Sequence, residues 1–157
     1  MIKIQNIAVP VDFSENSRKA ALYAAEFARE RNARLHLLHV INQRLIDVVQ
    51  ELSFKGYEGD TVEATEKMLK EREKELREFL DQASLKGLEV EYVLRKGKPG
   101  AEIIRFAEES NMDLIVIGTQ GRSPLTDALV GSAARMVIHR APCPVLVVHP
   151  YDRLFVE

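Results

Sequence analysis

Three glycines and one serine stand at fixed spacing in the second half of this 157-residue chain. Gly118, Gly121, Gly131 and Ser132 form the pattern Gly-x2-Gly-x9-Gly-Ser, between an apolar run and a run with helical periodicity. Glycine lets the backbone approach a ligand closely, and the N–H groups at the start of a helix favour an anion. The Ser132 hydroxyl can cap that helix or bond a phosphate oxygen. The pattern therefore indicates a phosphate site, and the alternative is a surface loop whose glycines only end a strand and start a helix.

Two other phosphate motifs are absent from the sequence. Neither the P-loop pattern Gly-x4-Gly-Lys-Ser/Thr nor the dinucleotide pattern Gly-x-Gly-x-x-Gly occurs. We therefore expect phosphate to be held by loop N–H groups together with Ser132 and Arg122, without a P-loop lysine. His36 and His39 lie three residues apart on a predicted strand, so they should point to opposite faces and cannot share a metal ion.

Composition narrows the class of protein. The length suits one domain with a real core, and 46% hydrophobic and 29% charged residues are typical of an ordinary globular protein. The net charge of −2 gives no reason to expect a nucleic-acid or membrane partner. No apolar run approaches the ~20 residues of a membrane span, and we see no signal segment, so we expect a cytoplasmic protein. A single cysteine excludes an internal disulfide.

Strands and helices alternate along the chain. Hydrophobic patterning predicts strands at 3–11, 35–41, 88–94, 113–117 and 145–148, and helices at 14–32, 60–84, 99–110 and 133–140. The strands are nearly continuous apolar runs, which is typical of a parallel sheet that helices cover on both faces. The sequence leaves two alternatives for the segment 42–59. It carries a short apolar helical face and is either a mobile lid over the site or a packed insertion.

The glycine pattern and the segment 141–148, Ala-Pro-Cys-Pro-Val-Leu-Val-Val, resemble the nucleotide-binding branch of the universal stress protein family. The likeness runs from Ile7-Ala-Val-Pro-Val-Asp12 to Val148. It implies a single universal stress protein domain over 1–157. The implied fold is an open five-stranded parallel α/β sheet of order 3-2-1-4-5, adenine nucleotide alpha hydrolase-like.

The resemblance also implies ATP as the ligand, with Mg²⁺ or Mn²⁺. The positions that match the family's nucleotide contacts, with their immediate neighbours, are Pro10, Val11, Asp12 and Val40 for adenine and ribose, and Gly118, Thr119, Gly121, Arg122, Gly131, Ser132 and Ala133 for the phosphates. Asp12 could accept from ribose hydroxyls or help to hold the cation, and the alternative is a turn aspartate before a helix. With strand order 3-2-1-4-5, Asp12 and Gly118 both fall where the order reverses, and ligands of such sheets bind there.

The last strand is the predicted edge of the sheet, yet its sequence is apolar and uncharged. Such an edge usually needs covering, and the resemblance implies a homodimer, so we expect two copies to pair along 145–148. We expect an ATP-binding regulatory or stress-response module that acts on an unknown protein partner. The alternatives are a slow ATP hydrolase or phosphate-transferring enzyme, and a nucleotide-free interaction module.

Overall fold

The computed structural model describes residues 1–56, 61–120 and 130–150. Their strands form one parallel sheet in the order β3-β2-β1-β4-β5, which confirms the expected order 3-2-1-4-5. The strands are β1 (Asn6–Pro10), β2 (Arg34–Asn42), β3 (Val90–Gly97), β4 (Leu114–Gly118) and β5 (Val145–Val148). The helices are α1 (Glu15–Arg31), α2 (Gln43–Phe54), α3 (Thr61–Arg77), α4 (Gln82–Leu85), α5 (Pro99–Glu109) and α6 (Ser132–Arg140).

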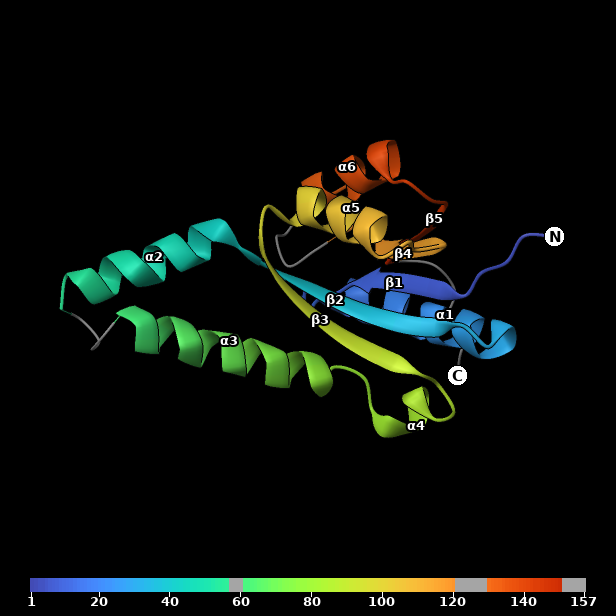
Figure 1. Cartoon of the computed structure of the whole chain (residues 1–157), viewed down its shortest axis with the longest axis horizontal. Helices are drawn as coiled ribbons and strands as arrows, with labels where there is room; N and C mark the ends of the chain where they lie inside the picture. Colours follow the sequence, from blue (N-terminus) through green and yellow to red (C-terminus); the bar gives the residue numbers. More distant parts are fainter. Residues whose placement is uncertain (57–60, 121–129, 151–157) are drawn as a thin grey trace.

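Each face of the sheet has its own hydrophobic core, because side chains alternate along a strand. Ile7 and Val9 of β1 pack with the alanine-rich face of α1, and Ala8 between them packs with α5 and α6. Figure 1 shows α5 and α6 on one side of the sheet and α3 on the other. Helices therefore cover both faces, as the strand pattern predicted.

The first helix begins and ends as its sequence indicates. Ser14 is its N-cap and accepts a 3.1 Å hydrogen bond from the Ser17 N–H. At the other end Asn32 takes the left-handed conformation, with φ 53°, and its N–H bonds back to the last carbonyls of the helix. These two caps hold α1 against β1 and bring its first turn beside the carboxyl end of that strand.

One predicted helix is wrong. The sequence suggested a continuous helix over 60–84, but α3 ends at Arg77 and a separate short helix, α4, begins after Asp81. Phe79 and Leu80 between them are buried in the core, which requires the chain to leave the helical path. Asp81 then starts α4 by accepting a 2.7 Å hydrogen bond from the Ser84 N–H.

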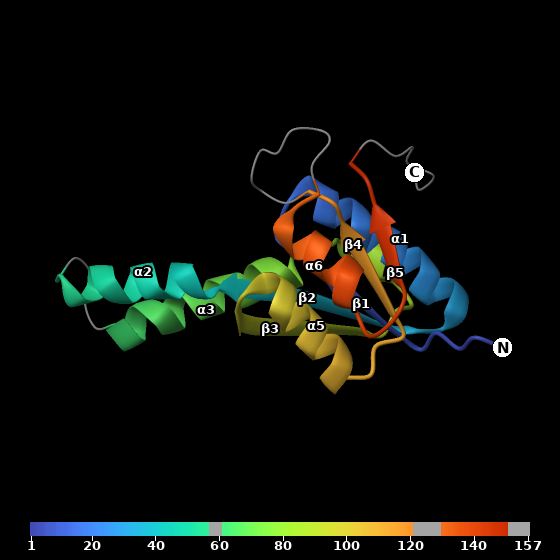
Figure 2. The ribbon, with the colours of Figure 1, turned by 90° about the horizontal axis from the view of Figure 1, so that it is seen from above.

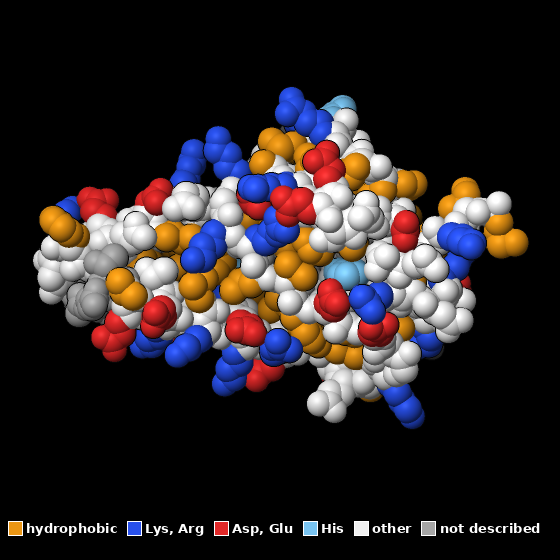
Figure 3. Space-filling view, viewed as in Figure 1, with side chains coloured by type: hydrophobic (Ala, Val, Ile, Leu, Met, Phe, Trp, Pro, Cys, Tyr) orange, Lys and Arg blue, Asp and Glu red, His pale blue; other side chains and the backbone are white. Residues whose placement is uncertain are grey.

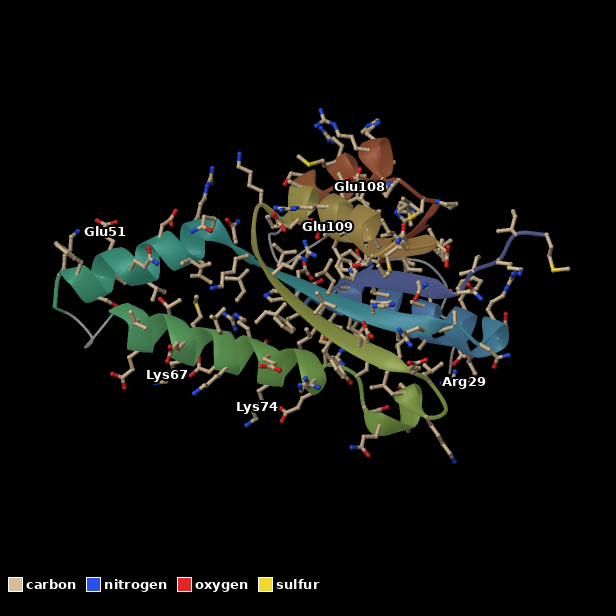
Figure 4. The ribbon with its side chains drawn as sticks, viewed as in Figure 1. Arg29, Glu51, Lys67, Lys74, Glu108 and Glu109 are labelled. Atoms are coloured by element: carbon tan, nitrogen blue, oxygen red, sulfur yellow. The ribbon has the colours of Figure 1, made fainter. Side chains whose placement is uncertain are left out.

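The described part of the segment 42–59 forms α2, which packs against α3. Together α2 and α3 form an arm that extends away from the sheet (Figures 1 and 2). Charged side chains of both signs run along this arm in Figure 3, and Lys67 and Lys74 lie along the side of α3 that faces away from α2 in Figure 4. The arm therefore matches the packed-insertion alternative. No helix among the described residues is long and apolar enough to cross a membrane.

Candidate functional site

A cleft of about 550 Å³ opens at the carboxyl ends of β1, β2 and β4. This is the place where the strand order reverses, since β1 has β2 on one side and β4 on the other. Nine of the sequence-predicted residues line it: Pro10, Val11, Asp12, Val40, Gly118, Thr119, Gly131, Ser132 and Ala133. The other two, Gly121 and Arg122, lie outside the described residues. The structure thus brings together, in one cleft, predicted residues from four separate stretches of the chain, 10–12, 40, 118–119 and 131–133.

The cleft also has lining residues that the sequence did not single out. They are Ser17, Leu38, Asn42, Pro99, Ile103, Ile117, Gln120, Val130, Ala134 and Arg135. Leu38, Ile103 and Ile117 give it an apolar wall. Two of the others carried a usable signal: Asn42 ends a strand and Pro99 begins a helix, and in a parallel α/β sheet both positions fall at the carboxyl edge.

Asp12 is part of a tight turn between β1 and α1. Its Oδ1 accepts hydrogen bonds from both the N–H, at 3.0 Å, and the hydroxyl of Ser14. Phe13, the next residue, has a positive φ of 65°, a conformation that costs a non-glycine residue energy and often occurs at functional sites. Asp12 thus takes part in the turn before α1 that its alternative assignment describes. The same carboxylate still lines the cleft, so the turn also places it there.

The start of α6 forms the opposite side of the cleft. Gly131, not Ser132, is its N-cap, and no side chain of the described residues caps this helix. The idea that the Ser132 hydroxyl caps α6 is wrong, because Ser132 is already the first helical residue. The first intrahelical bond joins the Arg135 N–H to the Gly131 carbonyl at 2.9 Å, so the N–H groups of residues 132–134 precede the helical ladder. These residues all line the cleft.

Asn16 is the structural residue that sequence analysis missed. It is 7% exposed in the first turn of α1, where its Oδ1 accepts a 2.8 Å hydrogen bond from the Gln120 N–H. Its Nδ2 donates to the Val148 carbonyl at 3.1 Å. A Cβ at Gly118 would lie 2.7 Å from the Asn16 Oδ1, so glycine is needed there for this contact. One buried amide thus joins α1 to the ends of β4 and β5.

Two histidines lie on opposite faces of β2, as their spacing predicted; His36 is buried and His39 is half-buried. The His36 ring lies 6.0 Å from the ring of Phe106, whereas His39 lies 4.5 Å from Phe13 on the other face. His39 Nδ1 is 2.6 Å from the Val11 carbonyl oxygen, directly behind the cleft. Burial lowers the pKa of both rings. Both are therefore neutral at pH 7, and His39 can donate to the Val11 carbonyl.

The electrostatics of the cleft rest on few groups. Among the described residues that line it, Asp12 is the acidic side chain and Arg135 the basic one. Four described helices begin at the cleft, because Ser17 of α1, Asn42 at the N-cap of α2, Pro99 of α5 and Ser132 of α6 all line it. Each helix adds the positive end of its dipole. No group of three or more potential metal ligands occurs within the described ranges. A divalent cation beside Asp12 would thus need most of its oxygen ligands from a bound ligand and water.

Fold and cleft together define an α/β protein with a cleft at a topological switch point. A family model, the Universal stress protein family, matches residues 3–149. Universal stress protein MJ0531 from Methanocaldococcus jannaschii is 34% identical over 144 residues, which cover 92% of this chain and 81% of the relative. Universal stress protein YxiE from Bacillus subtilis is 34% identical over 144 residues, 89% of this chain and 95% of the relative. The chain belongs to the universal stress protein family.

Solved structures show the same fold. MJ0577 from Methanocaldococcus jannaschii superposes with a TM-score of 0.80 at 28% identity, over 97% of this chain and 100% of the other. The universal stress protein from Archaeoglobus fulgidus in complex with dAMP has a TM-score of 0.55 at 25% identity, over 94% and 99% of the two chains. The fold is the adenine nucleotide alpha hydrolase-like one that the resemblance implied.

Proposed function

We propose that this chain binds an adenine nucleotide, ATP, in the cleft and works as a nucleotide-dependent regulatory module. The observation that carries the proposal is the first turn of α6. There residues 132–134 line the cleft with their N–H groups and the Ser132 hydroxyl, and within the described part of the chain no side chain caps the helix. Such a helix start favours phosphate through its free donors and its dipole.

The conformation of Gly131 also supports a phosphate at the start of α6. Its φ of −57° and ψ of 154° are open to any residue, so the backbone itself does not require glycine here. A missing Cβ at a position that lines a cleft leaves room for a ligand to approach the backbone. Gly131 is therefore best explained by the phosphate that we propose beside it.

The other end of the cleft suits the base and the sugar. Leu38, Val40 and Ile103 offer apolar surface for adenine, and Asp12 is placed to accept hydrogen bonds from ribose hydroxyls. A universal stress protein of the same fold has been solved with dAMP, which supports an adenine nucleotide here. With ATP bound, Mg²⁺ or Mn²⁺ would take its oxygen ligands from phosphates, water and Asp12.

The proposed assembly is a homodimer through β5, acting in the cytoplasm on a protein partner. β5 is an edge strand of the sheet, and its side chains are apolar. The carbonyls of Pro144 and Val148 accept from β4 at 3.0 and 3.3 Å. Because strand residues alternate in direction, Val145 and Val147 turn their backbone groups away from β4. A second copy pairing there would cover these groups.

Two measurements test the nucleotide proposal. The first is mass spectrometry of small molecules released from freshly purified protein after denaturation. The second is titration of ATP with Mg²⁺ into the nucleotide-free protein. Stoichiometric ATP or ADP, or micromolar binding, supports the proposal, and the ADP-to-ATP ratio over time then tests the slow-hydrolase alternative. Neither a released nucleotide nor measurable binding would favour the nucleotide-free interaction module.

A further inference from the structure

Arg135 is the basic side chain among the described residues that line the cleft. None of the nucleotide contacts proposed for this cleft involves it. It lies in the first turn of α6, four residues after Gly131. Its backbone N–H is bonded to the Gly131 carbonyl at 2.9 Å. Arg135 and Gly131 therefore lie on the same face of α6, one turn apart.

The direction of a helical side chain takes Arg135 toward the proposed phosphates. In an α-helix the Cα–Cβ bond tilts toward the N-terminus, so a long side chain covers the turn that precedes it. The residue on that face of the preceding turn is Gly131, which has no side chain to obstruct the guanidinium. Arg135 can thus reach over the N–H groups that begin α6.

The surroundings of Arg135 differ from those of the nearby arginines. Arg95 lies 2.7 Å from a carboxylate oxygen of Glu109, and Arg105 lies 2.8 Å from the other oxygen of the same group. In contrast, no ion pair or side-chain hydrogen bond joins Arg135 to any residue within the described ranges. Its guanidinium can therefore bind a phosphate without first leaving a carboxylate of the described residues. A guanidinium is well matched to phosphate because it can donate two parallel hydrogen bonds.

We propose that Arg135 contacts the terminal phosphates of the bound nucleotide, so that this cleft binds a nucleoside triphosphate more tightly than a monophosphate. The inference rests on the proposed function. The N–H groups of residues 132–134 can hold the phosphates nearest the helix start, whatever their number. Arg135, whose side chain reaches back over this helix start, would add its contacts to the phosphates that lie furthest from the ribose.

The experiment compares ATP and AMP on three proteins. Each nucleotide is titrated into nucleotide-free wild type, Arg135→Gln and Arg140→Gln in a calorimeter at fixed salt and Mg²⁺. Arg140 is the matched control, because it is an exposed arginine of the same helix that does not line the cleft. We expect Arg135→Gln to weaken ATP binding about tenfold or more and AMP binding less than about twofold. Arg140→Gln should leave both affinities within about twofold of wild type, and Arg135→Lys should weaken ATP binding by an intermediate amount.

The possible results separate this inference from the function on which it rests. If wild type binds neither nucleotide, the proposed function is wrong and the role of Arg135 falls with it. If wild type binds both but Arg135→Gln keeps the wild-type ratio of ATP to AMP affinity, only the role of Arg135 is wrong. An equal loss of ATP affinity in Arg135→Gln and Arg140→Gln would also overturn it, since net charge alone would then explain the effect. Melting curves establish that each variant is folded.

Discussion

Asn16 and Gln120 are 104 residues apart in the chain, yet the Asn16 Oδ1 accepts a 2.8 Å hydrogen bond from the Gln120 N–H. The same side chain donates to the Val148 carbonyl. Through these two bonds the first turn of α1 holds the residue that follows β4 and the end of β5. Asn16, a residue outside the glycine pattern, therefore positions the side of the cleft where the chain leaves β4.

Replacing this amide should cost stability. We expect Asn16→Ala to lower the free energy of unfolding by about 1–3 kcal/mol, because it leaves the partly buried Gln120 N–H without its acceptor and removes the donor to Val148. Urea unfolding measures the change. Glu15→Ala, at the exposed neighbouring position, serves as the control and should change stability by less than about 0.5 kcal/mol. Equal stability of the two variants would show that the Asn16 bonds contribute little.

The contact between Gly118 and Asn16 predicts a coupled pair of substitutions. Gly118→Ala would place a Cβ 2.7 Å from Oδ1 and 2.8 Å from Cγ of Asn16, and we expect this to cost about 1–3 kcal/mol in wild type. In an Asn16→Ala background the obstructing amide is gone, so the same change should cost much less. A double-mutant cycle from unfolding curves measures the difference. Additive costs would mean that Gly118 is required for another reason.

The two histidines of β2 predict a pH dependence of stability. Burial lowers the folded pKa of His36 and His39 below the ordinary 6.5, so the unfolded chain binds more protons in the window below that value. The contribution of the two rings to the free energy of unfolding should be fully present above pH 6.5. It should fall toward pH 5, by at most about 1.4 kcal/mol per pH unit for each ring. Glu91, beside His36, acts against its shift.

A substitution distinguishes the effect of His39 on the pH dependence of stability from the effects of other titrating groups. His39→Gln should flatten the slope of unfolding free energy between pH 6.5 and 5. Chemical unfolding at several pH values measures the slope in wild type and in the variant. A slope that is the same in wild type and His39→Gln would contradict the assignment of this pH dependence to His39.

The proposed dimer predicts different effects of proline at adjacent β5 positions. Val147→Pro removes an N–H that faces away from β4, where proline is tolerated in an edge strand. We expect this variant to stay folded but to become monomeric. Leu146→Pro removes a donor that faces β4 and should unfold the protein. Sedimentation at micromolar concentration measures the first result, and a monomeric wild type would contradict the dimer itself.

Sequence alone predicted the parallel sheet, because apolar strands and amphipathic helices alternate with clear periodicity. It failed at Phe79 and Leu80, whose apolar character continues a helical pattern although both side chains leave α3 to enter the core. The same limit applies to the cleft. The glycine pattern pointed to α6, but Asn16 and Arg135 carry no local signal, because the Asn16 contact and the position of Arg135 in the cleft arise only when α1, β4 and α6 meet.

The most direct test of the account is titration of ATP with Mg²⁺ into nucleotide-free wild type and Gly131→Val. The variant adds a side chain where we propose that phosphate approaches, at a backbone conformation that valine can adopt. We predict a loss of affinity of about a hundredfold, or about 2.7 kcal/mol, with the fold retained. Ala101→Val, at an exposed position on α5, controls for the added methyl groups and should bind ATP as wild type does. Wild-type affinity in Gly131→Val would contradict the placement of the phosphates at the start of α6.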